Sequence, residues 1–359
     1  MKPKFIKGLD LCETFYKEAV APILDRNFPD LVYSAALLGD GSEVLGFDTP
    51  QSTDHDWGPR LQLFLGETDL REHRENIDQA LRRELPVEIR GYVTNFAIND
   101  DATTFMSQDE NAHINHRVDI LSIRAFFEEV LNFDPMAEIR AADWVSVPEH
   151  NFRKLTAGRV FCDGLGQLEP IRDKLRYYPH EVWLYLLSTQ WQRISQEEHF
   201  MGRCGQVDDD LGSRLIAARL VRDLMRLCFL IEREYAPYIK WFGTAFNQLA
   251  CAADLVPVFQ EVLQAASWEQ RQQHLSTAYE TIAAMHNALN ITQPLSVKVT
   301  SFFNRPFQVI NAGRFVEAIR AQIEDPDVLA LPKRLGGFDQ FVDSTDALVY
   351  VDRIKAIYI

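Results

Sequence analysis

Two acidic residues spaced two apart are the first feature of this sequence that could do chemistry. Asp54 and Asp56 flank a histidine in Asp54-His55-Asp56. In an extended strand such residues point to the same face, and two neighbouring carboxylates repel each other unless a cation lies between them. Mg²⁺ binds a pair of carboxylates together with phosphate oxygens. The triplet therefore indicates a site for a metal–triphosphate complex, and its alternative is a solvent-exposed acidic turn.

A third carboxylate stands inside an apolar segment. Asp119 lies between Val118 and Ile120, and burying a charge there is costly unless it is paired or bound to a metal. On an edge strand Asp119 would instead face solvent. Glu88, in another apolar segment, is a rival for the same role, and we favour Asp119.

A turn rich in small residues precedes the acidic triplet. Gly41, Ser42 and Gly46 follow an apolar run, and glycine and serine allow backbone N–H groups to approach an anion closely. Glycine-rich turns are common, so this turn indicates phosphate binding only in combination with the carboxylates.

In order and spacing these features resemble the nucleotidyltransferase superfamily, which includes DNA polymerase beta and kanamycin nucleotidyltransferase. That family carries a G-S-x-x-x-G turn, a short loop ending in Ser-Asp, a D-x-D on a strand and a later single Asp on another strand. Gly41, Ser42 and Gly46 match the turn, residues 52–56 match the loop with its carboxylate pair, and Asp119 matches the third carboxylate.

The resemblance implies a role for each matched position. Asp54, Asp56 and Asp119 would hold two Mg²⁺ ions, and Asp119 would help to deprotonate the acceptor. The small-residue turn and Ser52 would bind the nucleoside triphosphate, with ATP as the first choice of donor.

A wider resemblance covers most of the chain. The stretches 52–60 and 235–243 look like a bacterial family known mainly as a nucleotidyltransferase-like domain of unknown function. Within the second stretch Lys240 stands between Tyr238 and Trp241. We interpret Lys240 as a nucleotide-binding residue, against the alternative of a surface lysine beside core aromatics.

The sequence departs from the superfamily pattern in two places. The middle residue of D-x-D is usually apolar and here is His55. The segment after it, Trp57-Gly58-Pro59, contains a proline that cannot donate to a sheet, so we expect the strand to be displaced or to lie at an edge. His113 and His116, just before Asp119, are either acid–base groups or ordinary loop residues.

The elements that must position these residues change in type along the chain. Apolar periodicity predicts helices at 9–27 and 69–84 and strands at 33–38, 60–65, 87–93 and 117–123. Beyond about residue 124 helical patterns dominate, at 124–132, 179–200, 211–235, 253–265 and 268–289. The expected fold class is α+β: a small mixed-sheet nucleotidyltransferase-like domain over 1–135, then a mainly helical domain over 136–359.

The amino-acid composition limits the kinds of binding partner to be expected. The 359 residues carry a formal net charge of −15, which disfavours nucleic acid because phosphate backbones are bound through Lys and Arg. No N-terminal targeting pattern or apolar run of membrane-spanning length is present, so we expect a cytoplasmic protein without a membrane partner.

Three functions are compatible with the sequence. The leading one is an enzyme that transfers a nucleoside monophosphate from an NTP to a hydroxyl of a small molecule, such as a cationic antibiotic. The second is nucleotidylation of a protein. The third is a nucleotide-binding regulator without turnover.

Overall fold

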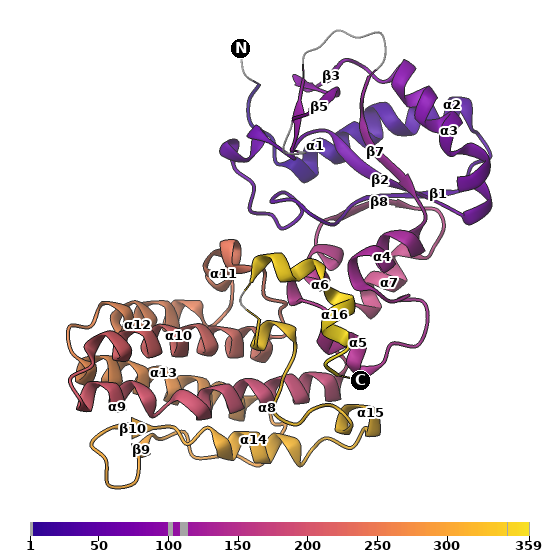
Figure 1. Cartoon of the computed structure of the whole chain (residues 1–359). Helices are drawn as coiled ribbons and strands as arrows, with labels where there is room; N and C mark the ends of the chain where they lie inside the picture. The colour runs from indigo at the N-terminus through magenta and orange to yellow at the C-terminus, as the bar shows by residue number, and fades with distance from the viewer. Residues whose placement is uncertain (1–2, 100–102, 108–113, 343, 359) are drawn as a thin grey trace. The chain divides into compact units, whose positions relative to one another are not determined.

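The computed structural model describes residues 3–99, 103–107, 114–342 and 344–358 (Figure 1). It comprises two compact units, which are described separately. The first combines residues 1–138 with 151–176, and the second combines 139–150 with 177–359. A mixed sheet in the first unit and a mainly helical second unit give the α+β class that the sequence predicts.

The first unit is built on a four-stranded sheet with the order β7-β2-β1-β8. The β2 and β7 strands run parallel, whereas β1 is antiparallel to both β2 and β8. In this sheet β7 is an edge strand. The strands are β1 (Tyr33–Leu37), β2 (Arg60–Leu65), β7 (Arg117–Leu121) and β8 (Arg159–Asp163).

Helices cover one face of this sheet. Leu61 and Leu63 of β2 and Val118 and Ile120 of β7 belong to a core cluster shared with the N-terminal helices and α3. Side chains alternate along a strand, so the residues between these four lie on the opposite face. The covering helices are α1 (Gly8–Phe15), a π-helical turn (Tyr16–Val20), α2 (Ala21–Asn27) and α3 (Glu67–Glu84).

Short elements complete the first unit. The segment 87–93, expected as one strand, is a hairpin that turns at Arg90 and Gly91, both of which have positive φ. A second hairpin follows it, and two helices flank β8. The elements are β3 (Glu88–Ile89), β4 (Tyr92–Val93), β5 (Phe96–Ile98), β6 (Thr104–Met106), α4 (Ile123–Leu131), α6 (Glu149–Thr156) and α7 (Leu168–Lys174).

The domain boundary differs from the expected division at residue 135. Strand β8 pairs with β1, with Cys162 opposite Ala35. The segment 151–176 therefore joins the sheet unit, although it lies beyond residue 135.

The second unit consists mostly of helices. The helical patterns expected at 179–200, 211–235, 253–265 and 268–289 are confirmed with small shifts of their ends. The elements are α5 (Ala141–Ser146), α8 (His180–Glu197), α9 (Phe200–Gln206), α10 (Asp210–Glu232), α11 (Ile239–Phe246), α12 (Ala252–Gln264), α13 (Trp268–Ala288), β9 (Thr300–Ser301), β10 (Gln308–Val309), α14 (Gly313–Arg320), α15 (Pro326–Leu329), 3₁₀ turns at Phe338–Gln340 and Thr345–Val349, and α16 (Val351–Lys355).

None of the helices in the described ranges combines the length and the apolar character that crossing a bilayer requires.

Candidate functional site

Asp54 and Asp56 lie in a loop that precedes β2, not in the strand. Asp54 ends a 3₁₀ turn, Pro50–Asp54, and Asp56 adopts a left-handed φ of 48°. The alternation of an extended strand therefore does not apply, and the expectation that the two carboxylates share a strand face is wrong. Proline explains the displacement, because Pro59 cannot donate to the sheet and β2 begins only at Arg60.

Local hydrogen bonds account for the shape of this loop. The backbone N–H of Thr49 donates to the hydroxyl of Ser52 over 3.1 Å, which closes the 3₁₀ turn. Asp54 pairs with the ring of its neighbour His55 at 2.9 Å, and its side chain is 59% exposed. Ser52 therefore has a structural role in the turn, and its binding of a nucleotide stays a prediction.

Asp119 lies in β7 on the face away from the helices. Its side chain is exposed, whereas Val118 and Ile120 on either side of it are buried. The carboxylate is thus a surface group of an edge strand, which was the alternative left open from the sequence. In the parallel register Gln62 lies opposite Asp119, and Arg60 lies opposite Arg117.

On this face of the sheet, β2 therefore carries an arginine, Arg60, and an amide, Gln62, beside Arg117 and Asp119. Arg60 is buried and donates from Nε and Nη2 to Glu43, at 2.9 and 2.6 Å, and from Nη2 to the carbonyl of Asp40 at 2.5 Å. Gln62 accepts from the backbone N–H of Leu38 at 2.9 Å. Both side chains thus hold the chain that leaves β1, which is the segment containing the glycine-serine turn.

Gly41 is required by this arrangement. Its φ is +140°, and a Cβ at this position would lie 2.5 Å from Nη2 of Arg60 and 2.7 Å from Glu43. Gly46 has a φ of +76°, and a methyl group added there would meet open space, so only its backbone conformation favours glycine. Gly41 therefore permits a close approach of Arg60 and Glu43, in addition to any approach of an anion.

Arg117 lies near Asp56 and shares a strand face with Asp119. Its Nη1 lies 3.7 Å from a carboxylate oxygen of Asp56, and Asp119 is two residues away on the same strand face. Asp56 is also tied to Thr104, whose carbonyl accepts from the Asp56 N–H at 2.7 Å and whose N–H donates to the carboxylate at 3.3 Å.

The electrostatics of the arginine pair follow from burial. The pKa of Arg117 is lowered first by burial and then by the positive charge of Arg60, while Asp56 and Asp119 act in the opposite sense. Arg60 is different: burial is the largest single effect and lowers its pKa, but Glu43, together with Cys12 and Asp119, raises it by more, so the pKa is raised. The charge of Arg60 is thus balanced by hydrogen-bonded Glu43. The charge of Arg117 is balanced less closely, because its nearest carboxylate oxygen is 3.7 Å away.

The predicted site residues are therefore brought together only in part. Asp56 lies 3.7 Å from Arg117, and the charges of Asp56 and Asp119 both act on Arg117. Gly41 lies close to Arg60 of β2. Asp54 points to His55. Among the described residues, no three His, Cys, Asp or Glu side chains form a group ready to hold a metal ion.

A buried carboxylate that the sequence analysis missed anchors the loop. Asp48 is 2% exposed and accepts from the N–H of Gly8 at 2.7 Å and from the indole of Trp57 at 3.3 Å. Lys7 pairs with it at 3.1 Å. Asp48 therefore joins the start of α1 to the two ends of the segment that contains Asp54 and Asp56.

The signals that could have identified the missed residues are weak but present. Arg60 begins an otherwise apolar strand, and Arg117 precedes Asp119 by two, which is the same-face spacing of a strand. Glu43 and Asp48 carry no comparable signal, because their burial depends on residues distant in sequence.

The remaining candidates have other surroundings. Glu88 is exposed on the β3–β4 hairpin. His116 is buried directly before β7, its Nδ1 accepts from the N–H of Val118 at 3.1 Å, and burial lowers its pKa. His113 lies outside the described residues. Lys240 belongs to the second unit, where it is exposed and lies 5.2 Å from the ring centre of Trp241.

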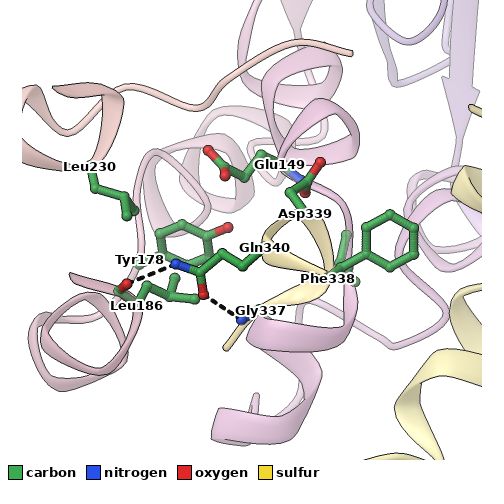
Figure 2. A pocket seen from close by; sticks show the side chains of 9 residues that line it. Glu149, Tyr178, Leu186, Leu230, Gly337, Phe338, Asp339 and Gln340 are labelled. Atoms are coloured by element: carbon green, nitrogen blue, oxygen red, sulfur yellow. Dashed lines mark hydrogen bonds between the residues drawn. The ribbon is translucent and has the colours of Figure 1, made fainter. Parts of the chain in front are cut away.

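The second unit contains a small cavity with a mixed polar and apolar lining (Figure 2). Glu149, Tyr178 and Asp339 line it, and its volume of about 10 Å³ suits one water molecule. Glu149 pairs with the buried Arg226 at 3.4 Å, and Gln340 donates to the carbonyl of Leu186 at 2.9 Å. The cavity is thus a packed part of the helical core and is too small for a nucleotide.

Comparisons with known proteins give few matches. A family model described as a domain of unknown function, DUF4037, matches residues 144–242. This range contains Lys240 but none of Asp54, Asp56 and Asp119. No curated protein matches the chain.

One solved structure is similar over much of the chain. It is the crystal structure, at 1.90 Å resolution, of a nucleotidyltransferase-like protein from Exiguobacterium sibiricum 255-15. The alignment covers 79% of this chain and 78% of that one, with 12% identity and a TM-score of 0.31. At that TM-score the similarity is too weak to establish a common fold or function.

Proposed function

We propose that the first unit binds a nucleoside triphosphate with Mg²⁺ beside Asp119 and transfers the nucleoside monophosphate to an acceptor hydroxyl. The observation that carries this proposal is that Arg117, at the start of β7, lies 3.7 Å from Asp56 and feels the charges of both Asp56 and Asp119. The glycine-serine turn is tied to the same strands through Arg60. Its motif order is the one that resembles nucleotidyltransferases.

The carboxylates of this site suit Mg²⁺ bound together with a nucleotide. Mg²⁺ is commonly held by one or two carboxylates plus the phosphates of its substrate, so a complete protein cage is unnecessary. Asp56 and Asp119 would supply these carboxylates, and Asp54, in the adjoining loop, would be the third. When bound, Mg²⁺ would screen the triphosphate and favour ionisation of the acceptor hydroxyl.

The transfer itself exchanges one P–O bond for another, and residues of the chain assist it. The acceptor oxygen attacks the α-phosphorus, the new P–O bond forms, the bond to the β-phosphate oxygen breaks, and pyrophosphate leaves. Asp119 takes the proton of the acceptor. The backbone N–H groups at Gly41 and Ser42 would orient the β- and γ-phosphates, and positioning of this kind supplies a large share of the rate.

The charge of the chain bears on the acceptor. A formal net charge of −15 favours a small cationic or neutral acceptor over a polyanion. We therefore propose a small molecule, such as a cationic antibiotic, with ATP as the first donor to test.

The test is pyrophosphate release from each of the four ribonucleoside triphosphates with Mg²⁺, across a panel of aminoglycosides and other hydroxyl compounds. Asp119→Asn should abolish acceptor-dependent release. Glu88→Gln, which removes an exposed carboxylate of the β3–β4 hairpin, is the matched control and should leave it intact. Equal activity of wild type and Asp119→Asn would refute the proposal.

A second candidate is a nucleotide-binding regulator. It would keep the fold and the metal but lack an acceptor site, and the observation that favours it is that Asp54 is exposed and paired with His55. Tight ATP binding without pyrophosphate release, with or without acceptors, would support the regulator. A gain of one nucleoside monophosphate on a protein would instead indicate protein nucleotidylation.

A further inference from the structure

Arg117 combines burial with an unused donor. Its side chain is 24% exposed, and its Nη1 is shielded from solvent without a hydrogen bond to any described residue. The nearest carboxylate oxygen, on Asp56, is 3.7 Å away, which is beyond hydrogen-bond range. A buried donor without an acceptor is costly. The rest of the side chain remains partly exposed, so a ligand that pairs with the guanidinium group gains binding free energy.

The neighbouring arginine does not share this property. Arg60 already donates to Glu43 and to the carbonyl of Asp40. Its donors therefore serve to hold the turn at Gly41. The two arginines lie opposite each other in the parallel register, so Arg117 is held beside a fixed positive charge.

The surroundings of Arg117 favour an oxyanion as its ligand. The guanidinium plane matches two oxygens of a phosphate, and this recognition is strongest where water is excluded. The ring of Phe96 lies 5.8 Å from the Arg117 guanidinium carbon and covers one side of it. An uncharged acceptor would leave the charge of this half-buried group less well compensated.

We propose that Arg117 binds the phosphate chain of the nucleotide, with its guanidinium group donating to a non-bridging phosphate oxygen. This inference rests on the proposed function, since it assigns a phosphate ligand within the same site. It makes Arg117 a binding residue that distinguishes nucleoside triphosphates from nucleosides.

The test is calorimetric titration of the full chain with ATP, tripolyphosphate and adenosine, with Mg²⁺ and with EDTA. Arg117→Gln should weaken ATP and tripolyphosphate at least tenfold and leave adenosine unchanged. Arg117→Lys, which keeps the charge and loses the planar fork, should give an intermediate loss. Arg124→Gln, which removes an exposed arginine paired with Glu128 on α4, is the control and should bind all three like wild type.

The outcomes separate this inference from the proposed function. If wild type releases pyrophosphate and Arg117→Gln binds ATP as tightly as wild type, the role of Arg117 is refuted while the function stands. If wild type binds tripolyphosphate through Arg117 without any turnover, the function fails and the inference stands. Absence of ATP and tripolyphosphate binding by wild type overturns both. If Arg117→Gln does not fold, Arg117→Lys decides, and unchanged phosphate binding by it refutes the inference.

Discussion

Arg60 donates two hydrogen bonds to one oxygen of Glu43, from Nε at 2.9 Å and from Nη2 at 2.6 Å, and both side chains are almost completely buried. A buried ion pair contributes little net stability when compared with apolar residues of similar size. Removal of one partner, however, leaves an uncompensated charge. The pair therefore fixes the turn after β1. Its contribution to stability becomes visible only when one partner is removed.

Glu43→Gln should destabilise the first unit strongly, by about 3–5 kcal/mol, because it leaves the Arg60 guanidinium buried without a counter-charge. Urea unfolding followed by intrinsic fluorescence measures this loss. Glu84→Gln, which breaks the exposed pair with Arg26, is the control and should leave the midpoint unchanged. A double variant, Glu43→Gln with Arg60→Gln, should recover part of the loss, and no recovery would mean that the charge is not the cause.

The two turn glycines should differ in their tolerance of alanine. Gly46→Ala meets open space and bears only the cost of a positive φ, about 1–2 kcal/mol. Gly41→Ala adds a collision with Arg60 and Glu43, so its unfolding midpoint should be clearly lower than that of Gly46→Ala. Thermal unfolding of both variants makes the comparison, and equal midpoints would contradict the close approach at Gly41.

The three carboxylates should not contribute equally to activity. Asp119→Asn and Asp56→Asn should each lower pyrophosphate release by about 10²-fold or more, since they remove the two carboxylates whose charges act on Arg117. Asp54→Asn should have a smaller effect, because Asp54 is exposed and paired with His55. Steady-state rates at saturating ATP and acceptor test this order. A loss for Asp54→Asn as large as for Asp119→Asn would mean that the loop changes its conformation on binding.

Glu198 in the second unit should give stability a pH dependence. Its two carboxylate oxygens accept from the backbone N–H groups of Asn311 and Ala312, each at 3.0 Å. Burial raises its pKa from 4.5 to about 7, and the backbone hydrogen bonds and Arg314 oppose this rise. The folded state then binds more protons than the unfolded state between these two values. The contribution of Glu198 is thus fully present below pH 4.5 and is lost as the pH rises to about 7.

Glu198→Gln removes this titration. The difference in unfolding free energy between wild type and Glu198→Gln should shift in favour of the variant by as much as about 3 kcal/mol from pH 4.5 to pH 8. Taking the difference cancels other groups, including His286, whose pKa burial lowers to about 4 and whose effect has the opposite sign. Denaturant unfolding at several pH values measures it. A constant difference across this range would show that Glu198 does not titrate there.

The regular elements could be predicted from local sequence because their periodicity is local. The 211–235 pattern became α10, and the alternation at 60–65 became β2. Burial of one face is enough to specify such elements, and this information lies within a few turns of chain. The order of the glycine-serine turn, the acidic triplet and Asp119, which suggested the chemistry, is likewise written in the sequence.

Tertiary structure decided the membership of the sheet and the surroundings of the acidic residues. Strand β8 pairs with β1 across more than a hundred residues, which no local pattern reports. Asp56 reaches Arg117 because the loop before β2 bends at a positive φ and the two parallel strands start in register. Pairing register is set by packing of the whole sheet on its helices. The sequence could therefore name the carboxylates, whereas the fold determined which arginine lies near Asp56 and feels the charge of Asp119.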